Sequence, residues 1–594
     1  MKSTKFSNYM KQRMARLNIP ARYIYYGIID KKGFYRILND EYTPNFWITN
    51  HLLSRMGVNT NSLFQYVNSK DFKAISLRNE IVYALNRHEY SAVSDMLENN
   101  WLPLCHSNTL LLQFYYTVKV MLSSQNGNAD SITLSYVESA LSLTLPNFTQ
   151  IDCLSYCLSY QELDLLLDFY HYSNESSSER FLEIYHYVNK RCYDSKCASF
   201  VQPKALVYYL QCTFTSNESL ELSKAHALVS LCQDTLTLLK KNNSTYFLVE
   251  IHNYLIKLLR YLFNQTADTA YLSLLNRSEL LLQTLDYIES ILACSFKTTG
   301  SSIIYSINRI EDICQTIHVR RKTLGLTRPA LCEEICNLTT LKRIEGGHSS
   351  PYSYTRDLLF QKLRLPTEAL KDSIIVENDV QRQRLSTYRQ LVNQAKWDEA
   401  KQLLDELSAA CDLQDKYTLQ SVLRMYDSCH VEKNHLPPSD SQETARFNLE
   451  LTLPLEKIEH ASQLYFTQNE LLCFLDYVRA CPSLSKKKTL RILENYMNQF
   501  SESERQTNWL FRNELILSTL LDEYLNLKDL EMINKYLQAL LQASIVNKRS
   551  YFFSDLLYLL EKLDLISFFP SFPYHLLSEL ASNNYRLTYY KNKI

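Results

Sequence analysis

The sequence repeats itself along the chain, and this self-similarity constrains the possible folds more than any other feature. Shifting the sequence by 307 positions (320 − 13) places Arg13 on Arg320, and the apolar positions that follow stay in register without gaps. Farther on, the tetrapeptide Leu-Thr-Leu-Pro at 143–146 recurs at 451–454, a spacing of 308 (451 − 143). A spacing this constant indicates two related copies of one unit, so each structural element is expected twice.

Glycine is scarce, with 8 residues among 594, where an average usage near 7% would give about forty. Sheets and tight turns need residues that accept a positive φ, whereas helices joined by short loops need few of them. The composition therefore predicts an all-α chain. Most of the glycines lie in two short stretches, one near the N-terminus and one just past the middle: Gly27, Gly33, Gly57, Gly325, Gly346 and Gly347.

Charge, cysteine usage and motif content argue against several classes of protein. The formal net charge is zero, so any nucleic-acid contact must come from local patches. The cysteines show no zinc-site spacing and are interpreted as reduced, buried residues. No GxSxG, HExxH or phosphate-loop motif occurs and the histidines do not cluster, so we expect no catalysis, no cofactor and no metal. The polar N-terminus and the lack of long apolar stretches predict a cytoplasmic protein without membrane contact.

Residues 313–372 are predicted to form five short helices with clear ends. Gly325 ends the first helix, and Thr327 is a good cap for the start of the second. A tight connection at Asn337 opens a third helix, which ends at Gly346. Two more helices follow, each beginning near a proline.

This segment resembles the phage-repressor-like (XRE) helix-turn-helix domain. The likeness rests on Arg-Arg-Lys-x-Leu-Gly-Leu-Thr from position 320, Leu-Cys-Glu-Glu-Ile-Cys from 331, Leu-Lys-Arg-Ile-Glu-Gly-Gly from 341 and Ser-Pro from 350. The short connection before the third helix is similar to the Rgg and PlcR branch, cytosolic quorum-sensing regulators that join this domain to tetratricopeptide-like repeats. The resemblance implies that the third helix enters the major groove of DNA.

The residue types on the predicted third helix fit that role by themselves. A helix in the major groove needs polar side chains near its exposed N-terminal end, while apolar residues such as Leu341 and Ile344 face the core. Basic residues on neighbouring helices would hold phosphates. The expected DNA contacts of this second head (residues 307–372) are Asn337, Thr339, Thr340, Lys342 and Arg343, with Arg320, Arg321, Lys322 and Arg328 on phosphates. The alternative is a solvated basic face on a helical bundle.

The matching first head (residues 1–66) is degenerate. Leu38 stands where the second head has Glu345, and Gly33 stands where Thr340 would touch a base. Glycine also weakens a helix by about 1 kcal/mol relative to alanine. Three roles stay open for this head: binding a different sequence, binding DNA without sequence preference, or packing alone. Its candidate DNA contacts are Lys31, Lys32, Tyr35 and Arg36.

The rest of each copy is predicted to consist of amphipathic helices joined by short polar loops. Between Tyr388 and Leu404, an apolar face at i,i+4 spacing breaks at Ala-Lys-Trp-Asp before a second helix begins. This pattern is similar to a tetratricopeptide hairpin, and in the resembled family such an array holds a short signalling peptide. The many tyrosines either line such a groove or pack in the core. The expected domains are head 1–66, array 67–296, linker 297–306, head 307–372 and array 373–594.

Two functions compete for this architecture. The leading hypothesis is a sequence-specific DNA-binding transcriptional regulator with two heads in one chain, acting on double-stranded DNA under the control of a peptide effector. The duplication then builds a pseudo-dimer within one polypeptide, and a homodimer with four heads is also compatible. The alternative is a helical-repeat scaffold for protein interactions that has lost DNA binding. The zero net charge and the degenerate first head favour the scaffold, whereas the second head opposes it.

Overall fold

The computed structural model describes residues 5–563, apart from 174–177, 216–219, 293–294, 299, 368–371, 376–377, 435 and 437. Nearly all regular structure in this part of the chain is helical, which confirms the predicted all-α class. None of the helices described is long and apolar enough to cross a membrane. The end of the second predicted array, 564–594, lies outside the described residues. The chain divides into two compact units, which are treated separately.

Unit 1 is formed by residues 1–12, 61–80 and 307–536. Its strands β1 (Gln65–Val67) and β2 (Ile310–Asp312) pair in parallel. Parallel strands cannot be joined by a tight turn, which fits their wide separation in the sequence. The helices that lie wholly in this unit are α15 (Ile313–Thr323), α16 (Arg328–Cys332), α17 (Leu338–Glu345), α18 (Ser353–Lys362), α19 (Asp379–Asn393), α20 (Trp397–Ala409), α21 (Lys416–Lys433), η6 (Pro438–Ser441), α22 (Gln442–Glu450), α23 (Leu455–His460), α24 (Gln468–Ala480), α25 (Ser483–Met497), α26 (Glu502–Gln506) and α27 (Leu510–Leu527).

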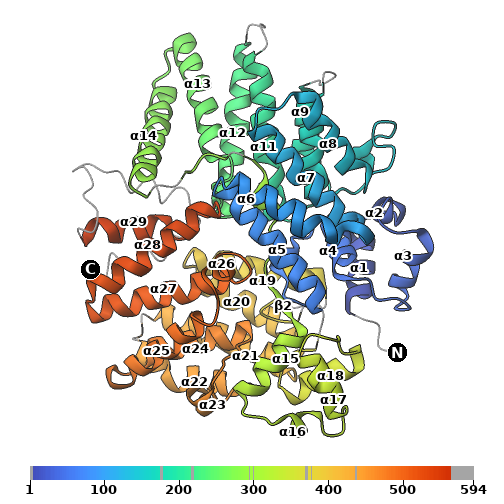
Figure 1. Cartoon of the computed structure of the whole chain (residues 1–594). Coiled ribbons are helices and arrows are strands. Elements are labelled where there is room, and N and C mark those ends of the chain that lie inside the picture. Colours follow the sequence, from blue (N-terminus) through green and yellow to red (C-terminus); the bar gives the residue numbers. More distant parts are fainter. Residues whose placement is uncertain are drawn as a thin grey trace. The chain divides into compact units, whose positions relative to one another are not determined.

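Unit 2 is formed by residues 13–60, 81–306 and 537–594. Its helices pack as antiparallel hairpins, for example α7 with α8 and α13 with α14, which run side by side in Figure 1. The helices that lie wholly in this unit are α2 (Arg22–Tyr25), α3 (Lys31–Leu38), α4 (Phe46–Arg55), α6 (Tyr90–Asp95), η2 (Met96–Trp101), η3 (Leu102–Ser107), α7 (Thr109–Gln125), α8 (Asp130–Ser142), η4 (Cys153–Ser155), α9 (Tyr160–Tyr172), α10 (Glu179–Lys190), α11 (Ser195–Thr215), α12 (Leu222–Lys241), α13 (Leu248–Thr266), α14 (Thr269–Leu292), η5 (Ser302–Tyr305) and α29 (Phe553–Lys562). The helices α1 (Lys5–Arg16), η1 (Thr60–Ser62), α5 (Ser69–Asn86) and α28 (Leu530–Val546) cross the boundaries between the units.

The helix positions follow the repeat seen in the sequence. Helix α17 begins 307 residues after α3 (338 − 31), and α18 begins 307 residues after α4 (353 − 46). Both α3 and α17 have the same length, as do α4 and α18. Helix α24 begins 308 residues after α9 (468 − 160). The spacing of the sequence repeat is therefore also the spacing of the helices.

The predicted linker 297–306 is not a solvated connection. Ser301, Ile304 and Tyr305 are buried in unit 2. The Lys548 ammonium donates hydrogen bonds to the backbone carbonyls of Ser295 and Lys297, both at 2.8 Å. Within the run of small residues that indicated a linker, Ser301 and Ser302 are buried, whereas Gly300 has open space around it. The compact units also cut across the predicted domains, because the described residues 537–563 group with most of the first copy.

A reciprocal backbone contact in unit 2 joins matching residues of the two copies. The Thr245 N–H donates to the Lys548 carbonyl at 3.0 Å, and the Ser550 N–H donates to the Asn243 carbonyl at 3.1 Å. Both pairs of equivalent residues are 305 positions apart (548 − 243 and 550 − 245). If the two copies are interchanged, each of these hydrogen bonds becomes the other, as expected for a local two-fold relation.

Candidate nucleic-acid interface

The second head has an apolar core in unit 1, to which Tyr465 from outside the head also contributes. Ile317 of α15, Leu331 of α16 and Leu359 of α18 are fully buried in it. Leu341 and Ile344 of α17 join the same core, which confirms their predicted inward orientation. Because residues three apart lie on one side of a helix, burying these two leaves the opposite side of α17 to solvent.

The start of α17 is held by a side-chain cap. The Asn337 side chain accepts a hydrogen bond from the Thr340 N–H at 2.7 Å, as is typical of helix N-caps. Asn337, Thr339, Lys342 and Arg343 are exposed, and Thr340 is half-buried. The structure therefore brings the predicted base-reading residues together on one short helix. Asn337, which is predicted to contact a base, also caps the helix.

Glu345, the last residue of α17, is buried among cations of the same head. Its carboxylate accepts hydrogen bonds from the Nε atoms of Arg321 at 2.5 Å and Arg328 at 2.6 Å, and His318 Nδ1 lies at 3.2 Å. Burial by itself would raise the pKa of Glu345, but the hydrogen bonds from Arg321, Arg328 and His318 outweigh it and hold this pKa below its usual value. The two arginines, together with His318, thus fix α17 to α15 and α16.

This network corrects the role predicted for Arg321 and limits that of Arg328. Arg321 is buried and bonded to Glu345, so it does not reach a phosphate. Arg328 is also bonded to Glu345, but its side chain is half-exposed and retains access to solvent. The sequence showed a run of basic residues here without showing the carboxylate that neutralises them.

Arg320 is likewise an internal residue and not a phosphate contact. Its side chain is 0% exposed, and its guanidinium binds both carboxylate oxygens of Glu470 at 2.6 and 3.0 Å. It also donates to the backbone carbonyls of Leu363, Tyr465 and Thr452. A guanidinium with this many partners ties the second head to the helices that follow it.

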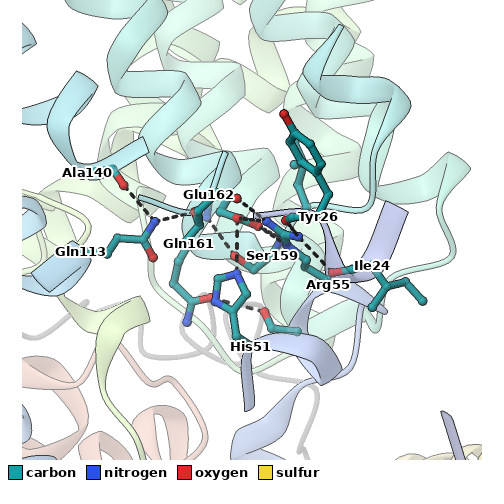
Figure 2. A network of polar contacts seen from close by, with 12 residues as sticks. Ile24, Tyr26, His51, Arg55, Gln113, Ala140, Ser159, Gln161 and Glu162 are labelled. Carbon is teal, nitrogen blue, oxygen red and sulfur yellow. Dashed lines mark hydrogen bonds and ion pairs between the residues drawn. The ribbon is translucent and has the colours of Figure 1, made fainter. Parts of the chain in front are cut away.

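An equivalent network lies in unit 2, where it joins the first head to α9 (Figure 2). Arg55 binds the buried carboxylate of Glu162 at 2.5 and 3.0 Å and donates to the carbonyls of Ile24, Tyr26 and Thr144. His51 lies 3.3 Å from the same carboxylate. Burial opposes ionisation of Glu162, but the charges of Arg55 and His51 lower its pKa well below the usual value.

The two networks use matching acids and differently placed arginines. Glu162 and Glu470 (470 − 162 = 308) are each the third residue of a helix that begins with a capping box. The arginine of unit 1 comes from α15, whereas Arg55 comes from the last turn of α4. Arg13, the sequence match of Arg320, keeps one contact of its counterpart by donating to the Met56 carbonyl at 2.9 Å.

The candidate contacts of the first head lie on α3. Lys31, Lys32, Tyr35 and Arg36 are all exposed, and Arg36 lies 3.9 Å from the carboxylate of Glu41. The Gly33 N–H binds the capping Asp30 side chain at 2.9 Å, and a Cβ atom at Gly33 would lie only 2.6 Å from that carboxylate. Glycine at this position therefore leaves room for the cap.

Unit 2 also contains a cavity of about 700 Å³. Its walls are the ends of α5 and α28, the last turns of α14 and part of the segment 295–303, so both copies contribute to it. Two acids, Asp286 and Glu289, and the bases Lys297 and Lys548 are among the lining residues. No group of His, Cys, Asp and Glu side chains suited to a metal is found in the described part of the chain.

Comparison with protein-family models, with curated proteins and with solved structures gave no match for this chain. The function proposed below is therefore argued from the residues just described.

Proposed function

We propose that this chain is a DNA-binding transcriptional regulator in which α17 of the second head reads bases in the major groove. In this proposal each copy consists of a helix-turn-helix head followed by tetratricopeptide-like helical hairpins. The observation that carries the proposal is the division of α17 into a buried apolar side and an exposed polar and basic side. Short polar side chains near the start of an exposed helix are what base-edge recognition requires.

Because Arg320 and Arg321 are buried, we expect the second head to make few ionic contacts with DNA phosphates. Lys342 and Arg343 are exposed, and Arg328 is half-exposed. Each phosphate contact contributes about −0.9 to the slope of log affinity against log salt. Two or three such contacts predict a slope of roughly −2 to −3 for this head. This slope is less steep than that of regulators with many phosphate contacts.

For the first head we propose a supporting role on the DNA backbone. Lys31 and Lys32 at the start of α3 are exposed, and the polar residue that would read a base is replaced by Gly33. Cationic side chains without neighbouring short polar groups suit phosphates better than bases. This head would then add affinity without adding sequence preference.

The test is recovery of genomic DNA fragments by the purified full-length chain, compared with the variant T339A/T340A/K342A/R343A. The cap of α17 joins the Asn337 side chain to the backbone N–H of residue 340 and does not use the Thr340 side chain, so the variant should keep its fold. The matched control is K487A/R491A, which removes one lysine and one arginine from the exposed side of α25.

We expect discrete genomic sites with the wild-type chain and with the control, and their loss in the α17 variant. No enrichment by the wild-type chain at low salt would contradict the proposal and favour the scaffold. Equal enrichment by the α17 variant would remove α17 from the interface. The salt slope of the wild-type complex gives an independent measurement of the phosphate contacts.

We further propose that an effector, which the family resemblance suggests is a short peptide, binds in the cavity of unit 2. Its volume of about 700 Å³ lies within the range of known ligand sites. Because both copies line the cavity, a bound molecule would contact both. Addition of a true effector should raise the melting temperature of the chain, and the double variant D286N/E289Q should weaken that shift.

A further inference from the structure

Two tyrosines of the second head stand out by their exposure. Tyr352 is 88% exposed and Tyr354 is 75% exposed, and the next large hydrophobic residue in the described part of the chain, Phe447, is 59% exposed. A single exposed apolar residue needs no explanation, but two aromatic residues this accessible and only two positions apart are unusual. Tyrosine is also enriched at binding surfaces, because one end of the ring is apolar and the other is polar.

Both tyrosines belong to the segment that follows α17. Tyr352 is the residue before α18, and Tyr354 is the second residue of that helix. The residues between α17 and α18, Gly-Gly-His-Ser-Ser-Pro at 346–351, include no acid. The exposed cations Lys342 and Arg343 lie on the preceding helix. On α18, the acid Asp357 is paired with Arg356 at 2.6 Å, so the surroundings of the two rings favour a polyanionic partner.

The first head shows that the fold itself does not require these rings outside. At the matching positions it has Asn45 (352 − 307) and Trp47 (354 − 307). Asn45 caps α4 by accepting from the Ile48 N–H at 3.0 Å, and Trp47 is only 5% exposed. In the second head, by contrast, α18 has no side-chain cap, and the aromatic residue at the second position of the helix is exposed. Such a change in one copy alone points to a contact outside the head.

We propose that Tyr352 and Tyr354 hold the sugar-phosphate backbone of double-stranded DNA beside the helix that reads the bases. This inference rests on the proposed function. A phenol hydroxyl donates a hydrogen bond to a phosphate oxygen, and the ring packs against the neighbouring sugar. These contacts are neutral and carry no base information. They supply the backbone contacts that the buried Arg320 and Arg321 cannot make.

The test measures the affinity of the full-length chain for two duplexes of equal length. One is a fragment recovered with the wild-type chain, and the other has a random sequence. The variant Y352F/Y354F removes only the hydroxyls and should fold normally. The control Y426F removes the hydroxyl that binds Asp405, outside both heads.

We expect Y352F/Y354F to bind both duplexes roughly tenfold more weakly than the wild-type chain, because hydrogen bonds to charged groups are lost. The salt slope should stay unchanged, since no cation is removed, whereas R343A should make it less steep by about 0.9. The variant Y352A/Y354A should lose at least as much affinity as the phenylalanine variant.

Unchanged affinity of Y352F/Y354F, or a loss confined to the recovered fragment, would overturn this inference and leave the proposed function standing. The second outcome would place the tyrosines on base edges. Failure of the wild-type chain to bind either duplex would overturn the inference together with the proposed function.

Discussion

Glu345 should be a position of the second head at which substitution is costly. Its side chain is 1% exposed and is bound by Arg321 and Arg328. The variant E345L introduces the residue found at the matching position of the first head, Leu38. It leaves the Arg321 guanidinium, whose side chain is 10% exposed, without its carboxylate. We expect a loss of about 3 kcal/mol, at the lower end for a broken buried ion pair, because the 39% exposed Arg328 can turn toward water.

The first head also indicates the compensating change. It has Met14 (321 − 307) and Leu38 (345 − 307) where the second head has Arg321 and Glu345. Replacing both members of a buried ion pair by apolar residues of similar size is often neutral or stabilising. The double variant R321M/E345L should therefore recover most of the stability lost by E345L and retain a deficit of roughly 1 kcal/mol or less.

Amide hydrogen exchange of the peptide that covers α17 measures this local stability directly. A loss of about 3 kcal/mol corresponds to exchange roughly a hundredfold faster or more, because each 1.4 kcal/mol is a factor of about ten. The control E333Q changes a carboxylate that is 74% exposed and should leave the exchange unaltered. The reasoning would be refuted if α17 exchanged in E345L at the wild-type rate, or if it exchanged in the double variant as fast as in E345L.

Three further predictions concern the buried charges. The lowered pKa of Glu345 means that its ionised form stabilises the second head above about pH 4.5, its usual value, and that this stability is lost as the pH falls through the lowered value. Relative to the intrinsic exchange rate at each pH, protection of α17 should therefore fall in acid in the wild-type chain but not in the double variant, and identical protection profiles would argue against the network. E162Q should lower the free energy of unfolding by about 3 kcal/mol, because Arg55 keeps a buried charge, and a loss below about 1 kcal/mol in chemical denaturation would contradict this. K548M removes two charge-assisted hydrogen bonds and should make amide hydrogen exchange around 295–298 roughly tenfold faster. Unchanged exchange there would contradict a stabilising role for these two hydrogen bonds.

Local patterns in the sequence predicted local structure well. The all-helical class followed from the scarcity of glycine, and the inward orientation of Leu341 and Ile344 followed from helical periodicity. The position of Asn337 at a tight connection matched its role as the cap of α17. Each of these features depends on residues a few positions apart, so a single sequence contains the necessary information.

Long-range partners could not be predicted in the same way. Arg320 matched a residue type that binds phosphates, but its partner Glu470 lies 150 positions away. Both residues had matches in the repeat, at Arg13 and Glu162, yet nothing in the sequence showed that these positions meet in space. The first copy even draws its arginine, Arg55, from another helix. The segment 297–306 shows the same limit, because small residues suit an exposed loop and also allow burial of the kind seen at Ser301 and Ser302.

The reciprocal contact between residues 243–245 and 548–550 has a consequence for how this molecule evolves. In a homodimer every substitution appears on both sides of the two-fold axis at once. Here the equivalent positions are encoded separately, so one side can change while the other is kept. Lys548 secures the segment near Ser295, whereas its counterpart Asn243 has a shorter, uncharged side chain that cannot donate as a cation. Covalent linkage also replaces an encounter between separate molecules by a high effective concentration, which makes the pairing insensitive to dilution.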